Sequence, residues 1–130
     1  MAKQTNQTQQ FKVTIYEKQD GSSPLKDFIT SLNAQFQART LRTIELLRER
    51  GNELREPYTK HLSDGIFELR IQSGNNIARV CYFFMVGRNI ILTNGFVKKT
   101  QKTPKSEIDK AKEYRADYLA RLQNGGNHGL

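Results

Sequence analysis

Two arginines and a run of lysines are the residues of this sequence whose types and spacing could do chemistry. Arg70 and Arg79 lie in neighbouring apolar stretches, and residues 98–105 contain four lysines and no acidic residue. Arginine forks match phosphate oxygens with paired hydrogen bonds, and clustered cations lower the pKa of a neighbouring lysine. Such a set suits the binding of a phosphodiester and the stabilisation of the negative charge that develops when its phosphorus is attacked.

Three predicted strands must bring these residues together. Apolar patterning predicts strands over about 66–73, 76–86 and 89–97. The dipeptides Gly74-Asn75 and Gly87-Arg88 between them have the composition of two-residue hairpin turns. We therefore expect three consecutive antiparallel strands joined by tight turns.

These turns set a register, and the register predicts which residues lie side by side. Arg70 is expected directly opposite Arg79, Phe96 opposite Arg79 on the next strand, and Asn94 opposite Cys81. The face that carries Arg70 is otherwise expected to hold Glu68, Gln72, Arg79, Cys81, Asn94, Phe96 and Lys98. The opposite face is expected to form the core, with Phe67, Leu69, Ile71, Ala78, Val80, Tyr82, Phe84, Ile91 and Val97.

Two arginines directly across a strand pair repel each other, so this pair needs an explanation. One interpretation is that a phosphate group binds between Arg70 and Arg79. The other is that an acidic residue such as Glu68 neutralises them. Both interpretations remain open from the sequence alone.

The rest of the chain supplies helices around these strands. Residues 11–16 alternate like a strand, and Ser23 followed by Pro24 predicts the start of a helix. A second helix is expected from about Gln35 until Gly51. Residues 52–64, which include Lys60 and His61, are expected to form a loop.

Thr103 and Pro104 predict the start of a last helix, which Asn124-Gly125-Gly126 is expected to end. The predicted class is α+β with the order β-α-α-β-β-β-α, in which a helical hairpin and a C-terminal helix pack on a mainly antiparallel sheet. Residues 11–123 are expected to form one domain, with flexible segments at 1–10 and 124–130.

Composition narrows the class of protein. The 130 residues carry a net charge of +8, which points to a polyanion such as nucleic acid or the ribosome as partner. A single cysteine excludes an internal disulfide, and with only two histidines beside it an all-protein transition-metal site is not expected, so no cofactor is predicted. With no apolar run of membrane-spanning length, we expect a cytoplasmic protein that does not bind membranes.

Three segments in order resemble RelE-like toxins of the RelE/ParE superfamily, and in particular their HigB-like, phage-derived branch. They are residues 60–70 (KHLSDGIFELR), 79–84 (RVCYFF) and 95–104 (GFVKKTQKTP). The resemblance extends over about residues 11–118. It implies a RelE-like fold and a toxin of a bacterial or phage toxin–antitoxin pair, which cleaves mRNA on the ribosome. The implied antitoxin often has a helix-turn-helix domain.

The resemblance also implies roles for single residues. Arg70 and Arg79 match family arginines that bind phosphate and stabilise the transition state, and Lys98 and Lys99 match basic positions at the end of the last strand. Lys60 matches a lysine that precedes the strand with Arg70. His61 falls at a variable position and is a weaker candidate for proton transfer, while Phe96, Lys102 and Lys105 are expected to contact RNA.

The predicted reaction is metal-independent cleavage of RNA, in which a ribose 2′-hydroxyl attacks the adjacent phosphorus and leaves a 2′,3′-cyclic phosphate. The alternative is a protein of the same fold that is not a nuclease: a ParE-like inhibitor of gyrase, a phage protein that binds a host factor or nucleic acid, or a degenerate toxin that binds only its antitoxin.

Overall fold

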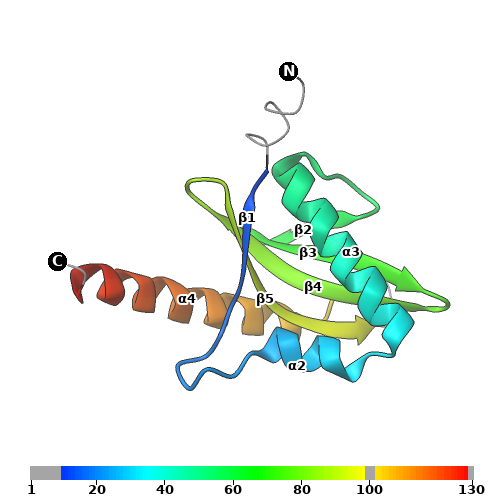
Figure 1. Ribbon diagram of the computed structural model, residues 1–130, viewed down its shortest axis with the longest axis horizontal. Helices are drawn as coiled ribbons and strands as arrows, with labels where there is room; N and C mark the ends of the chain where they lie inside the picture. Colours follow the sequence, from blue (N-terminus) through cyan, green and yellow to red (C-terminus); the bar gives the residue numbers. More distant parts are fainter. Residues whose placement is uncertain (1–9, 99–101, 129–130) are drawn as a thin grey trace.

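A five-stranded sheet in the order β1-β5-β4-β3-β2 lies between two layers of helix (Figure 1). The computed structural model describes residues 10–98 and 102–128. β1 runs parallel to β5, and all other neighbouring strands are antiparallel, so the predicted α+β class with a mainly antiparallel sheet is confirmed. The elements are β1 (Lys12–Ile15), α2 (Pro24–Ser31), α3 (Ala34–Arg50), the 3₁₀ turn η1 (Gly51–Glu53), β2 (Thr59–Ser63), β3 (Ile66–Ser73), β4 (Asn76–Met85), β5 (Asn89–Lys98) and α4 (Lys105–His128).

The first helix begins, and the second helix ends, at the residues that the sequence predicts. The Ser23 hydroxyl accepts a hydrogen bond from the backbone N–H of Lys26, and Pro24 occupies the first turn of α2. α3 ends at Gly51, whose φ of 55° suits glycine. A Cβ at Gly51 would also collide with the ring of Phe11, so the position needs glycine for space as well as for conformation.

One strand was not predicted. Residues 59–63 were expected to belong to a loop, but they form β2, which pairs antiparallel with β3 at the edge of the sheet. Lys60 lies opposite Glu68, and His61 lies opposite Phe67. An edge strand buries little surface and so shows no strict apolar alternation, which is why the sequence pattern missed it.

Each face of the sheet has its own apolar cluster. On the face of α2 and α3, Leu25 and Leu47 pack against strand residues such as Leu69, Val80 and Leu92, and all five are fully buried. On the face of α4, a smaller cluster contains Tyr16, Ile66, Cys81, Phe83, Ile91 and Ala111. The sheet face that carries Arg70 is therefore partly covered by α4 and is not a fully open surface.

The register between β3 and β4 is as predicted, but the one between β4 and β5 shifts. Arg79 faces Phe96 as expected, whereas Tyr82 faces Leu92, and an irregularity lies between Val80 and Tyr82. The predicted pairing of Cys81 with Asn94 is therefore wrong. The extra residue in β5 also turns Ile91 to the face of α4, opposite to its predicted side.

The last helix differs from the prediction at both ends. α4 begins at Lys105, and the carbonyl oxygen of Pro104 accepts the N–H groups of Glu107 and Ile108. The helix continues to His128, past the glycine pair that was expected to end it. In Figure 1 its C-terminal part extends beyond the edge of the sheet. No helix within the described residues is long and apolar enough to cross a membrane.

Candidate functional site

Arg70 and Arg79 lie directly opposite each other, and one carboxylate joins them. Glu68 Oε2 accepts a hydrogen bond from Arg70 Nε at 2.8 Å and from Arg79 Nη1 at 2.5 Å. Of the two side chains, Arg79 is 4% exposed and Arg70 is 23% exposed, while that of Glu68 is fully buried. The interpretation that Glu68 neutralises the arginine pair is therefore confirmed, and the buried carboxylate holds both guanidinium groups in place.

Thr103 completes the coordination of this carboxylate. Its hydroxyl donates to Glu68 Oε1 at 2.5 Å, and the residue is buried. Thr103 was expected to cap α4, but its side chain instead ties the connection between β5 and α4 to the centre of β3. Nothing in the sequence signals this contact, because it joins residues 35 positions apart. The contact between Glu68 and Arg70, in contrast, can be predicted from the sequence, because residues two apart on a strand have their side chains on the same face.

Lys98, on the neighbouring strand β5, adds a further positive charge close to Arg79. It lies opposite Ile77 at the end of β5 and is 6% exposed. Within the described part of the chain, its Nζ and the Nε of Arg79 are buried and have no hydrogen-bond partner. Burial lowers the pKa of Lys98, and the charges of Arg79 and Lys102 lower it further against the opposing effect of Glu68. Three cations thus surround one buried carboxylate.

A hollow of about 170 Å³ opens beside this cluster. Four of the residues singled out in the sequence line it: Lys60, His61, Arg70 and Lys102. Glu68 and Thr103 also contribute to its wall, together with Leu62 and Ile108. We call it the cationic hollow. Residues from β2, β3 and the connection before α4 converge here, so the tertiary structure confirms that they are neighbours.

Other predicted site residues lie apart from the cationic hollow. Lys105 is exposed on the first turn of α4, where it forms an ion pair with Asp109. Phe96 is half-buried and packs against the apolar cluster beneath α4. Lys99 lies outside the described residues. Arg79 belongs to the cluster, but its side chain is buried and does not line the cationic hollow.

His61 lies at the rim of the cationic hollow. Its Nε2 accepts the backbone N–H of Gly65 at 3.2 Å, and its ring meets Phe67 edge-on with 5.0 Å between centroids. The side chain is exposed on the edge strand β2. The hydrogen bond assigns the proton of a neutral ring to Nδ1, which leaves that nitrogen as a donor.

The described residues hold no group of three or more His, Cys, Asp or Glu side chains arranged to bind a metal ion. The cysteine of β4 is buried, and burial together with Glu68 raises the pKa of its thiol to about 12. Cys81 is therefore a protonated, unreactive thiol at neutral pH.

Comparison with known proteins finds a family model and solved structures that resemble this chain. The family described as "Phage derived protein Gp49-like" matches residues 27–116, a stretch that contains the whole cationic hollow. The crystal structure of the archaeal RelE–RelB complex from Pyrococcus horikoshii OT3 has a chain that aligns with a TM-score of 0.44 and 14% identity, over 72% of this chain and 99% of its own. No curated protein matches significantly. The predicted resemblance is confirmed, and the chain belongs to the Gp49-like family of phage-derived proteins, a RelE/ParE-like toxin family.

Proposed function

We propose that this protein is the toxin of a toxin–antitoxin pair and acts as a ribosome-dependent mRNA endonuclease. Family membership supports a toxin of such a system. The observation that carries the nuclease proposal is the cationic hollow, in which Lys60, Arg70 and Lys102 surround one small space. An anion that enters this space meets cations from three separate segments of the chain, which suits a phosphodiester.

The proposed reaction is attack within the RNA strand. A base removes the proton of a ribose 2′-hydroxyl, and the resulting oxygen attacks the adjacent phosphorus. The bond from phosphorus to the 5′-oxygen then breaks, an acid protonates that oxygen, and a 2′,3′-cyclic phosphate remains. Arg70 stabilises the negative charge of the crowded intermediate, because Glu68 holds its Nε and the residue lines the cationic hollow.

Proton transfer falls to the exposed groups at the rim of the cationic hollow. Lys60 is exposed on β2 opposite Glu68 and reaches the substrate directly, whereas His61, whose ring packs against Phe67, is the weaker candidate. Lys98 has a lowered pKa, but it is buried below the surface, so we assign it to the electrostatics of the cluster. Arg79 has the same supporting role, since one of its nitrogens is bound to Glu68 and its side chain is closed to solvent.

The proposed partners are mRNA, the ribosome and a cognate antitoxin with a helix-turn-helix domain, in the cytoplasm of a bacterium. The net charge of +8 favours association with ribosomal RNA, and such association weakens as the salt concentration rises.

Primer extension on a translated message, after induction of the protein in cells, tests the proposal. We expect new 5′ ends within coding sequence for the wild type and none for Arg70→Ala. Arg42→Ala is the matched control, because Arg42 is exposed on α3 on the other face of the sheet. Unchanged mRNA ends together with inhibited DNA supercoiling by purified gyrase would contradict the nuclease and support the gyrase inhibitor.

A further inference from the structure

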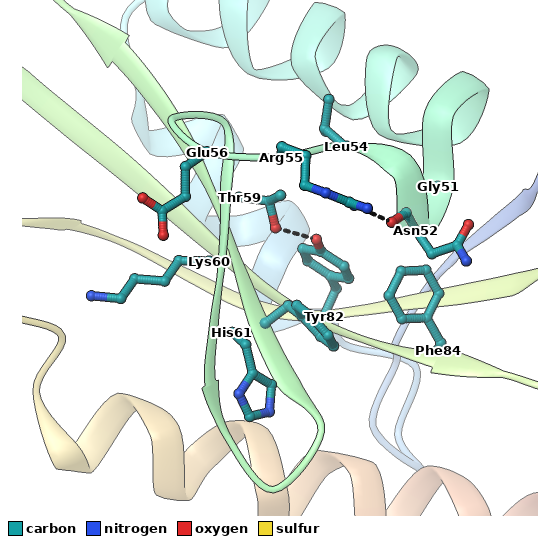
Figure 2. A pocket seen from close by; sticks show the side chains of 11 residues that line it. Gly51, Asn52, Leu54, Arg55, Glu56, Thr59, Lys60, His61, Tyr82 and Phe84 are labelled. Carbon is teal, nitrogen blue, oxygen red and sulfur yellow. Dashed lines mark hydrogen bonds between the residues drawn. The ribbon is translucent and has the colours of Figure 1, made fainter.

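A second, larger hollow of about 240 Å³ lies between β2, the neighbouring strands β3 and β4, and the segment after α3 (Figure 2). Its floor consists of three aromatic rings, Phe67, Tyr82 and Phe84, and we call it the aromatic hollow. The segment after α3 forms its upper rim, with Asn52 and Arg55. None of the roles proposed above uses this space.

The aromatic floor is rigid and partly open. Phe67 stacks on Tyr82 with 5.5 Å between centroids and 19° between planes, and Phe84 meets both rings edge-on. Tyr82 is fixed from behind by a hydrogen bond between its hydroxyl and that of Thr59. Phe67 and Phe84 are only half-buried, so they leave aromatic surface at the floor of the hollow. A flat aromatic ligand would find a preformed stacking surface here.

The rim supplies polar groups above this floor. Arg55 Nη1 donates to the backbone oxygen of Asn52 at 2.7 Å, which holds the exposed guanidinium along the top of the hollow in Figure 2. The side-chain amide of Asn52 and the carboxylate of Glu56 add a second donor and two kinds of acceptor. Hydrogen-bond groups above an aromatic surface are the chemistry that reads the edge of a nucleobase.

The two hollows share a wall. Lys60 and His61 line both of them, and as consecutive strand residues they point to opposite faces of the sheet. Lys60 lies opposite Glu68 on the face of the cationic hollow, and His61 lies opposite Phe67 on the face of the aromatic hollow. Since β2 is an edge strand, no further strand within the described residues blocks a chain that crosses from one hollow to the other.

We propose that the aromatic hollow binds the unstacked base of the RNA nucleotide next to the scissile phosphodiester. This inference rests on the proposed nuclease function and assigns a base-binding subsite to it. The phosphate is held by Lys60 and Arg70 in the cationic hollow, and the backbone crosses β2 at His61. The base stacks on Phe84, and because the two rings are 81° apart it meets Phe67 at an edge. The cations at both hollows complement a polyanionic strand, which favours RNA over an apolar segment of protein as the occupant.

Sequencing of cleaved transcripts in cells provides the test, because a base subsite determines which nucleotide flanks the cut. We expect the wild type to prefer one base at one position beside the cut. Asn52→Ala and Arg55→Ala, both at exposed rim residues, should relax the preference at that position alone. Phe84→Leu should reduce cleavage about tenfold by removing the stacking surface. Arg42→Ala is the control and should leave the preference unchanged.

A second measurement isolates the base itself. Purified wild-type protein is given ribosomes programmed with a message that carries an abasic residue at the preferred position. We expect cleavage about tenfold slower than with the intact base for the wild type, and no difference between the two messages for Phe84→Leu. The thermal midpoint of each variant is recorded, so that loss of folding is separated from loss of the subsite.

The outcomes distinguish the two proposals. If the wild type cuts no message, the nuclease function fails and this inference fails with it. If cleavage requires Arg70 but the rim variants keep the wild-type base preference and the abasic message is cut equally fast, only the subsite is overturned. Rim variants that cleave normally but no longer bind the antitoxin would assign the aromatic hollow to a protein partner, which also overturns it.

Discussion

The two faces of the central sheet are made by the same strands, but one face forms the apolar core and the other carries a buried charged cluster. On the face of α2 and α3, residues such as Leu69 and Val80 are fully buried in an apolar cluster. On the other face, their chain neighbours Arg70 and Arg79 share the buried carboxylate of Glu68. One residue along a strand therefore separates the stabilising core from a charged site.

The difference between the two faces indicates how the fold tolerates the unfavourable free energy of burying charged side chains. Burying charged groups disfavours folding unless each is paired, and Lys98 Nζ has no partner among the described residues. The apolar face offsets this cost, because it packs two helices against the strands that carry the charges. The charged face can then be kept for function, and substitutions on the two faces should differ in how they affect stability and RNA cleavage.

The largest expected effect is on the charged face. Glu68→Ala removes the carboxylate that pairs Arg70 and Arg79, and it should lower the free energy of unfolding by about 3–5 kcal/mol, because Arg79 stays buried without a counter-charge. Urea unfolding measures the change. Lys105→Ala, which breaks an exposed ion pair, is the control and should change stability by at most about 1 kcal/mol. A loss for Glu68→Ala no larger than this would contradict the central role of the carboxylate.

On the apolar face, Leu69→Ala should cost about 2–5 kcal/mol, because it leaves a cavity in the cluster beneath α3. The protein that remains folded should cleave RNA normally, since Leu69 points away from the cationic hollow. Leu41→Ala is the matched control at a position 56% exposed. A specific loss of cleavage in the folded fraction of Leu69→Ala would show that the two faces are not independent.

Lys98→Met should have the opposite sign and stabilise the protein by about 1 kcal/mol, with a thermal midpoint about 4 °C higher, while lowering cleavage. Its charge is buried, and folding lowers its pKa. Protonated Lys98 therefore destabilises the fold fully below its folded pKa, and this effect is relieved as the pH rises toward the ordinary lysine value of 10.5. The advantage of the variant should shrink over that range. Equal stability at pH 7 would contradict the prediction.

The smallest effect concerns the attachment of α4. Asp117 accepts hydrogen bonds from the Tyr16 hydroxyl and Arg121, which lower its pKa below 3.8. Because folding lowers this pKa, the stabilisation is complete above the unfolded value and is lost as the pH falls through the folded value. Thermal midpoints should drop below about pH 4 in the wild type, and this drop should be smaller in Asp117→Asn. If the thermal midpoint falls equally at low pH in the wild type and in Asp117→Asn, the pH dependence comes from other carboxylates.

Much of the fold follows from local patterns in the sequence. Ser23-Pro24 and Gly51 set helix ends through hydrogen bonds and backbone conformation within a few residues. The turn at Gly74 set the register that places Arg70 opposite Arg79. The edge strand β2 and the shift between β4 and β5 were missed, because neither has a local signature: one buries little surface, and the other inserts a single residue.

The sequence by itself determined the strands other than β2, the register between β3 and β4, and therefore the meeting of Arg70 with Arg79, because backbone hydrogen bonding and turn geometry act over short distances. Only the tertiary structure decided which groups surround the two arginines and how deeply they are buried. It placed Glu68 between the arginines, brought Thr103 to the carboxylate from 35 residues away and buried Lys98 without a partner among the described residues. It also gathered Lys60 and Lys102 around one hollow. Burial and long-range contact depend on how the helices cover the sheet, and no local pattern records them.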